Sequence, residues 1–301
     1  MGPMTTAELR SAARVVPAQR TVEGAGFVVH RPFPSRALET MDPFLMIDEL
    51  GPVDYAPGEA VGAPDHPHRG FETISYILDG EVEHEDSAGF SGTLRAGSVQ
   101  WMTAGSGVVH SEMPSRRIRE QGGRVHGFQI WVNLPSQLKM TRPRYQDVDA
   151  SRIPVARSED GKVSVRVIAG EALGARAVID THVPITYLHF TIAPGGSIVQ
   201  PVDRTHDAGA YVFDGVGVVG GTEVEARRLV VLGAGDAVEL RVPETAPGPM
   251  QLLLLSGTPI REPVAWYGPF VMNQPAEIQQ AIADYQAGRM GAIAPETRVI
   301  G

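Results

Sequence analysis

Two short segments of this sequence each carry a pair of potential metal ligands two residues apart. The first pair is His66 and His68, and the second is His110 and Glu112. Side chains alternate between the two faces of a β-strand, so residues i and i+2 point to the same side. If the two segments are strands that face each other, three imidazoles and one carboxylate meet at one point. The spacing therefore predicts a metal site.

Short extended segments separated by turns run through the first half of the chain. Residues 73–78 alternate between apolar and polar side chains, and the Asp79-Gly80 pair that follows is typical of a hairpin turn. The predicted strands cover residues 44–47, 73–78, 81–85, 93–95, 98–103, 108–112 and 128–132. Short strands at intervals of about ten residues are typical of a β-sandwich or barrel. We therefore expect an all-β fold.

The second half of the sequence repeats the first in outline. The segment Tyr-Ile-Leu-Asp-Gly at 76–80 has a counterpart in Tyr-Val-Phe-Asp-Gly at 211–215. Two copies of one β-unit also suit the length of 301 residues, because domains commonly hold about 150. We expect a polar lead-in over residues 1–20, a metal-binding domain over 21–134, a connection over 135–162, and a second domain over 163–301 that ends in a helix.

The repeat also indicates which half holds the metal. When the two Asp-Gly turns are aligned, His66 and His68 fall opposite Pro201 and Asp203. The strand that carries His110 has no histidine counterpart in the second copy. We therefore expect one metal per chain, bound in the N-terminal half, and a second domain without metal ligands.

A helix is predicted close to the C-terminus. Asn273 is a suitable N-cap, Pro275 suits the first turn, and Gly288 is a typical helix end. Ile278, Ile282 and Tyr285 recur at helical spacing, so we expect this apolar face to be buried.

The residues alone leave the carboxylate ligand open. Glu72 shares strand parity with His66 and His68, whereas Glu112 shares parity with His110. Histidines without such a partner are expected to be hydrogen-bonded core residues, namely His30, His84, His126 and His189.

The composition limits which metals and which partners the chain is expected to bind. The chain has no cysteine, so it forms no disulfides and offers no thiolate ligand, which disfavours copper(I). This also fits a reducing compartment, and we predict a cytoplasmic protein. The net charge of −9 disfavours binding to nucleic acid or anionic membranes, which are polyanions. No segment approaches the roughly 20 apolar residues of a membrane span.

The wording of the two motifs resembles a known family. His-x-His-x3-Glu followed by a later strand histidine resembles the double motif of the cupin superfamily. Asp-His-Pro-His-Arg-Gly-Phe-Glu-Thr at 65–73, Gln-Trp-Met-Thr-Ala-Gly at 100–105 and His-Ser-Glu-Met-Pro at 110–114 are similar to the pirin family of bicupins. The resemblance covers residues 20–290, apart from the lead-in. It implies two cupin barrels (double-stranded β-helices, or jelly rolls) in tandem with a short C-terminal helix.

The resemblance also implies a ligand set. In pirins the metal is iron, and the residues that match its ligands are His66, His68, His110 and Glu112. We therefore expect Fe(II), although zinc, manganese, nickel and cobalt also accept these ligands. Residues that could orient an imidazole or sit at the mouth of the site without binding the metal are Asp65, Arg69, Glu72 and Gln129.

Two functions follow from the resemblance. Some pirins are quercetin 2,3-dioxygenases, which implies an oxidoreductase that opens flavonols with dioxygen. For this reaction we expect Glu112 as the catalytic group that accepts the proton of the 3-hydroxyl, with Glu72 as the alternative. Others are regulators, which implies a metal-dependent protein that modulates a transcription factor or a metabolic enzyme. A basic segment that could meet such a partner contains Arg116, Arg117, Arg119 and Arg124.

Overall fold

The computed structural model describes residues 7–293, which form two compact units. The first unit contains residues 20–31, residues 44–151 and the chain from Ile260 onward. The second unit contains the chain up to Gln19, residues 32–43 and residues 152–259. Each unit is therefore built from segments that lie far apart in the sequence.

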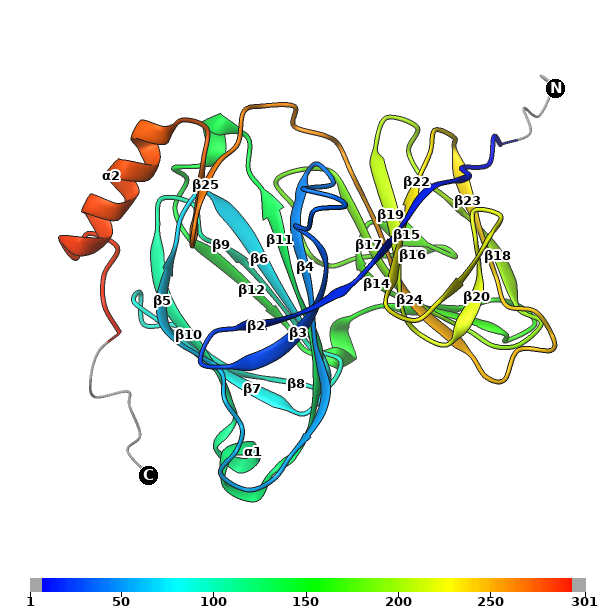
Figure 1. Cartoon of the computed structure of the whole chain (residues 1–301), viewed down its shortest axis with the longest axis horizontal. Coiled ribbons are helices and arrows are strands. Elements are labelled where there is room, and N and C mark those ends of the chain that lie inside the picture. The colour runs from blue at the N-terminus through cyan, green and yellow to red at the C-terminus, as the bar shows by residue number, and fades with distance from the viewer. Residues whose placement is uncertain (1–6, 294–301) are drawn as a thin grey trace. The chain divides into compact units, whose positions relative to one another are not determined.

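The first unit is a barrel of two sheets (Figure 1). Its seven-stranded sheet has the order β12 (Arg144–Val148), β9 (Val99–Thr103), β6 (Phe71–Asp79), β11 (Gly123–Asn133), β4 (Phe44–Tyr55), β3 (Phe27–Phe33) and β2 (Gln19–Glu23). Its four-stranded sheet has the order β5 (Ala63–His68), β10 (Val108–Pro114), β7 (Glu81–Asp86) and β8 (Ser91–Arg95). Smaller elements are α1 (Arg116–Gln121), η1 (Ser136–Leu138), β25 (Ala265–Tyr267), β26 (Phe270–Met272) and α2 (Pro275–Gln286).

The second unit has the same architecture. Its seven-stranded sheet has the order β1 (Ala12–Pro17), β22 (Arg228–Leu232), β19 (Asp207–Asp214), β24 (Met250–Gly257), β17 (Ile185–Ile192), β14 (Val163–Ala169) and β13 (Val155–Arg157). Its four-stranded sheet has the order β18 (Ser197–Pro201), β23 (Ala237–Arg241), β20 (Val216–Val219) and β21 (Thr222–Glu225). It also holds η2 (Ala150–Arg152, at its boundary) and the hairpin β15 (Glu171–Ala172) and β16 (Ala175–Arg176). The predicted all-β fold of two cupin barrels in tandem is confirmed.

Alternation along the strands builds the cores. In β14, Val163, Val165 and Val167 are fully buried, whereas Ser164 and Arg166 between them are half-exposed. The inward residues of both sheets of the second unit form one cluster of valines, leucines and alanines. Burial of apolar area at about 25 cal/mol per Å² is the main force that closes such a barrel.

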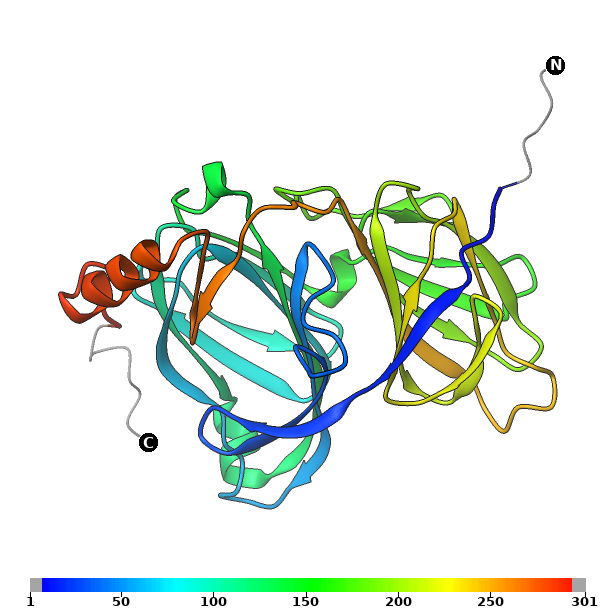
Figure 2. The ribbon, with the colours of Figure 1, turned by 45° about the horizontal axis from the view of Figure 1, so that its top comes forward.

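The N-terminal segment is part of the second unit and not a lead-in with little to bury. β1 pairs antiparallel with β22, so that Val15 lies opposite Val230 (Figure 2). Just before β1, the Arg10 side chain is 2% exposed and donates hydrogen bonds to four backbone carbonyls, those of Asp203, His206, Gly233 and Gly235. The expectation of a polar lead-in was wrong for β1, because its partner strand lies more than 200 residues away, and residues 1–6 lie outside the described residues.

The predicted connection over residues 135–162 also contains sheet strands. β12 pairs antiparallel with β9 at the edge of the first unit's sheet. β13 pairs with β14 in the second unit. The segment therefore supplies one edge strand to each unit, and the turn between them is short.

The helix α2 belongs to the first unit, although it follows the second unit in the sequence. Its N-cap is Gln274 rather than Asn273, and Glu277 completes a capping box. Ile278 packs against the β25–β26 hairpin, but Tyr285 is 40% exposed, so its predicted burial was wrong. No helix within residues 7–293 has both the length and the apolar character that a membrane span needs.

Candidate metal centre

The two predicted ligand segments lie side by side in the four-stranded sheet. β5 and β10 pair antiparallel, and the register places His66 opposite His110 and His68 opposite Val108. A bulge follows His110, so that Glu112 lies opposite Ala63. The predicted proximity therefore arises between neighbouring strands of one sheet.

The three imidazoles form one compact cluster. One ring nitrogen from each of His66, His68 and His110 lies within 4.8 Å of the other two. The Nε2 atoms of His66 and His68 are 3.0 Å apart. The ring centroids are separated by 4.4 to 4.9 Å. Three ring nitrogens that converge in this way form a group that can bind a metal.

The surroundings keep these nitrogens ready for a metal. Burial lowers the pKa of His68 and of His110 well below the ordinary value of 6.5, and the neighbouring imidazoles lower it further. Both rings are therefore neutral near pH 7, and their lone pairs remain available. His66 donates from Nδ1 to the carbonyl of Pro64 at 2.7 Å, which leaves its Nε2 lone pair directed at the cluster.

The buried His110 ring tests whether a metal fits. It is 1% exposed, and neither of its ring nitrogens has a hydrogen-bond partner within residues 7–293. Buried polar atoms without a partner are rare because each costs about 1–3 kcal/mol. Coordination of a metal by one ring nitrogen would remove the penalty for that atom. The donor set therefore fits a first-row metal held by three imidazoles.

Glu112 lies beside the cluster but outside the close group of nitrogens. Its Oε1 accepts a hydrogen bond of 2.6 Å from the Ser75 hydroxyl, and its Oε2 accepts one of 2.7 Å from Gln129 Nε2. Gln129 Oε1 in turn accepts from Trp131 Nε1 at 3.4 Å, which orients the amide. The carboxylate is thus held by two donors in the same cavity as His66 and His68.

Glu72 faces away from the histidines. Gly70 has a φ of 89°, and a Cβ there would collide with the carbonyl oxygen of Val271. The chain turns at this point, so His68 ends β5 and Glu72 begins a strand of the other sheet. Its carboxylate accepts a hydrogen bond of 2.6 Å from the Thr103 hydroxyl, and burial raises its pKa. Strand parity with His66 therefore does not place Glu72 at the cluster.

Of the other two residues predicted near the site, Asp65 lines the cavity and Arg69 does not. The Arg69 guanidinium is buried, and it binds the Ser106 carbonyl and the Asp284 carboxylate of α2 rather than the mouth of the cavity. Asp65 is exposed and lines the cavity beside His66.

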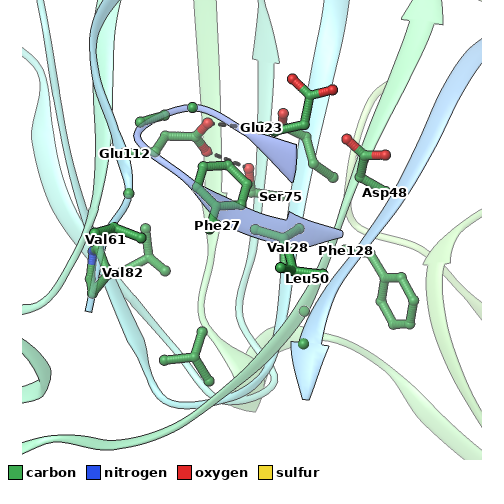
Figure 3. Close-up of a pocket in the computed structure, with 18 of the residues that line it drawn as sticks. Glu23, Phe27, Val28, Asp48, Leu50, Val61, Ser75, Val82, Glu112 and Phe128 are labelled. Atoms are coloured by element: carbon green, nitrogen blue, oxygen red, sulfur yellow. Dashed lines mark hydrogen bonds between the residues drawn. The ribbon is translucent and has the colours of Figure 1, made fainter. Parts of the chain in front are cut away.

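The cavity of the first unit has a volume of about 590 Å³ (Figure 3). His66, His68 and Glu112 lie on one of its walls, and aromatic rings border the cluster. Trp131 lies 5.2 Å from the His68 ring and 5.7 Å from Trp266, measured between ring centroids. Pockets of about 300–1,000 Å³ commonly bind small organic molecules. The cluster therefore borders a space of suitable size for an aromatic ligand.

A row of polar side chains crosses the seven-stranded sheet beneath this cavity, and the sequence reasoning missed it. The register aligns Asp147 with Gln100, Gln100 with Ser75, Ser75 with Gln129, and Gln129 with Asp48. Gln129 was predicted near the site, whereas Ser75 was missed, although it is a polar residue between the apolar Ile74 and Tyr76. Their alignment across five strands depends on register and is not visible in any one segment.

Comparison with known proteins identifies a family and relatives to which this chain is similar. The chain matches the pirin family over residues 26–132 and the pirin C-terminal cupin domain over residues 187–291. A pirin-like protein from Solanum lycopersicum is 44% identical over 285 residues, which cover 94% of this chain and 93% of that protein. Pirin from Homo sapiens is 41% identical over 274 residues, covering 89% and 90% of the two chains.

Two solved structures extend the comparison. Quercetin 2,3-dioxygenase from Acinetobacter baumannii superimposes with a TM-score of 0.88 at 36% identity, covering 95% of this chain and 100% of that one. The Escherichia coli pirin YhhW in complex with nickel(II) has a TM-score of 0.61 at 19% identity, covering 84% and 99%, which shows the shared fold alone. On the family matches and on relatives above 40% identity over most of their length, this chain belongs to the pirin family.

Proposed function

We propose that this protein is a dioxygenase that opens flavonols such as quercetin at a mononuclear Fe(II) centre. The observation that carries the proposal is the cluster of three imidazoles, two of which, His66 and His68, line a cavity of about 590 Å³. The likeness to a quercetin 2,3-dioxygenase at 36% identity supports the choice of substrate. The cytoplasm remains the proposed location.

His66, His68 and His110 would hold the metal, and we propose Glu112 as the fourth ligand. When bound, the metal supplies a Lewis-acidic and redox-active centre for dioxygen chemistry. Nitrogen and oxygen ligands without sulfur suit Fe(II), and also Zn, Mn, Ni and Co. YhhW was solved in complex with nickel(II), so elemental analysis of the purified protein is the test of metal identity.

Glu112 is the proposed proton acceptor. Flavonols carry an acidic 3-hydroxyl, and its deprotonation makes the heterocycle electron-rich enough to react with dioxygen. The Glu112 carboxylate is held by Ser75 and Gln129, which fix its direction toward the cavity. Trp131 and Phe71, with ring centroids 4.3 Å apart, exclude water from the side of His68. A positioned base of this kind contributes about 10²–10⁴-fold to a rate.

The test is turnover of quercetin by iron-loaded protein, followed as loss of flavonol absorbance together with oxygen uptake. We expect one molecule of dioxygen to be consumed for each molecule of quercetin that disappears. His68→Ala should abolish turnover, whereas His189→Ala should not, because His189 is a buried histidine of the second unit. Circular dichroism of both variants checks that they fold.

A protein that holds its metal but does not turn over quercetin would contradict the proposal. That result would favour the alternative, a metal-dependent regulator of a transcription factor or metabolic enzyme. The helix α1 carries Arg116, Arg117 and Arg119, which are exposed and pair with Glu120, Glu81 and Glu83 in that order. These arginines are therefore largely neutralised by their own neighbours.

A further inference from the structure

The cavity has a second polar site, which the proposed chemistry does not use. Arg31 on β3 donates from Nε and Nη2 to the two carboxylate oxygens of Asp48, at 2.7 and 2.6 Å. The same Nη2 atom lies 2.7 Å from Glu23 Oε1. All three side chains line the cavity. We call this group, Glu23, Arg31 and Asp48, the distal triad.

The register of the sheet places the distal triad apart from the histidines. Asp48 lies opposite Gln129, and Gln129 lies opposite Ser75, so β4 is two strands away from β6. Neighbouring strands are about 4.8 Å apart, which puts Asp48 on the order of 10 Å from Ser75. Figure 3 shows Glu112 beside Ser75 on one side of the cavity, with the carboxylates of Asp48 and Glu23 on the other.

Apart from Gln129, which lies between Ser75 and Asp48, the surface between the two polar sites is apolar. Phe27, Val28, Leu50 and Phe128 line this part of the cavity, and Figure 3 shows Phe128 below Asp48 and the other three between Glu112 and Asp48 across the view. Aromatic and branched aliphatic side chains of this kind stack against flat rings. A ligand that reaches from the histidines to the distal triad therefore passes these apolar side chains and the Gln129 amide.

The charges of the distal triad limit which chemical group of a ligand can bind there. One guanidinium and two carboxylates give a net charge of −1, which disfavours an anionic ligand group. The Asp48 and Glu23 oxygens keep lone pairs beyond those that Arg31 uses, and no partner of Arg31 Nη1 is found in the described part of the chain. A neutral hydroxyl can donate to these carboxylates and accept from Nη1 at the same time.

We propose that the distal triad recognises the ring hydroxyls of a polyphenol at the end of the ligand remote from the metal. The inference rests on the proposed function, and it names the substrate class more closely: flavonols with a hydroxylated phenyl ring. A substrate whose remote ring lacks hydroxyls leaves the triad without a partner. Loss of one such hydrogen bond to a charged group commonly costs about tenfold or more in affinity.

The test measures anaerobic binding to the iron-loaded full chain through quenching of tryptophan fluorescence, because Trp131 and Trp266 line the cavity. The ligands are quercetin and galangin, the flavonol that lacks both hydroxyls on the phenyl ring. We expect quercetin to bind about tenfold more tightly. Glu23→Gln should reduce this preference to about threefold or less without changing the affinity for galangin. The side chain of Glu23 is 39% exposed, so the substitution leaves the barrel intact.

Glu85→Gln is the matched control, since Glu85 lies on β7 outside the cavity lining and should keep the full preference. Equal affinity of the unaltered protein for quercetin and galangin would overturn the inference without any variant. A preference that persists in Glu23→Gln would overturn it as well. Binding with the expected preference but without turnover would leave the distal triad in place and refute the dioxygenase instead, so the two failures are distinguishable.

Discussion

Two carboxylates close to the histidines in sequence lie in different surroundings. Glu112 is half-buried, borders the cavity, and is held by Ser75 and Gln129. Glu72 is fully buried on the other face of β6 and is held by Thr103. A carboxylate affects a metal strongly only if it can approach the ion, so these two residues should differ sharply in their effect on metal affinity.

We predict that Glu112→Gln weakens metal binding by more than about 100-fold, whereas Glu72→Gln changes it by less than about tenfold. The first substitution removes a negative charge beside the histidines, and the second alters a residue that faces away from them. Competition with a chelator at fixed pH measures both affinities. Comparable losses in the two variants would show that Glu112 is not a ligand.

The imidazoles also set how the metal-free protein responds to pH. Because the pKa values of His68 and His110 are lowered in the folded state, the unfolded chain binds protons first as the pH falls below about 6.5. Metal-free protein should therefore lose stability between pH 7 and pH 5, by at most about 1.4 kcal/mol per pH unit for each histidine. Urea unfolding at several pH values measures this slope. The double variant His68→Gln/His110→Gln should flatten it, and an unchanged slope would contradict the assignment.

At the scale of elements, α2 is fixed to the first unit by an apolar contact and an ion pair. Ile278 and Ala281 are buried against the β25–β26 hairpin. Arg69, the residue after His68, donates to the Asp284 carboxylate at 2.7 Å. Arg69, Arg289 and Gln280 hold the pKa of Asp284 well below its ordinary value. The helix is thereby tied to the end of β5.

We predict that Ile278→Ala destabilises α2 by about 2–4 kcal/mol, because it leaves a cavity beneath the helix. Tyr285→Ala, on the same helix but 40% exposed, should change stability by less than about 0.5 kcal/mol. Amide hydrogen exchange of the helix reports both effects. Equal effects of the two substitutions would mean that the contact with the hairpin does not hold α2.

Elements and the grouping of histidines were predictable where the pattern is local. Alternation and the Asp79-Gly80 turn predicted β6, and spacing of two residues brought His66 and His68 to one side, because both are properties of a single strand. The side of Glu72 was not predictable in this way, since Gly70 ends one strand and the chain continues in another sheet. The distal triad was missed for a related reason: Arg31 and Asp48 meet only through the pairing of the sheet.

At the scale of the whole molecule, each end of the chain belongs to the unit that lies farther from it in the sequence. β1 completes the sheet of the second unit, while the chain after Ile260 completes the first. Residue 10 therefore stabilises a barrel whose other strands begin beyond residue 150. A sequence divided at residues 135–162 would separate segments that fold together.

We predict that Arg10→Ala destabilises the second unit by about 3–5 kcal/mol, because it removes the buried guanidinium that donates to four backbone carbonyls. Arg14→Ala, an exposed change on the neighbouring strand, should have an effect within about 0.5 kcal/mol. Hydrogen exchange resolved by segment locates the loss. An effect confined to residues 7–19 would show that β1 is not part of the cooperative unit.

This placement of the chain ends sets the order in which the units are completed during translation. The ribosome delivers the chain from residue 1 onward, and domains generally fold as units once their segments have emerged. The last segment of the second unit ends at Pro259, but the first unit still awaits the residues from Ile260 onward. The barrel that carries the histidines thus receives most of its strands before the second barrel does, but is finished after it. A chain released after residue 259 would contain every strand of the C-terminal barrel, whereas the N-terminal barrel would lack its β25–β26 hairpin and helix.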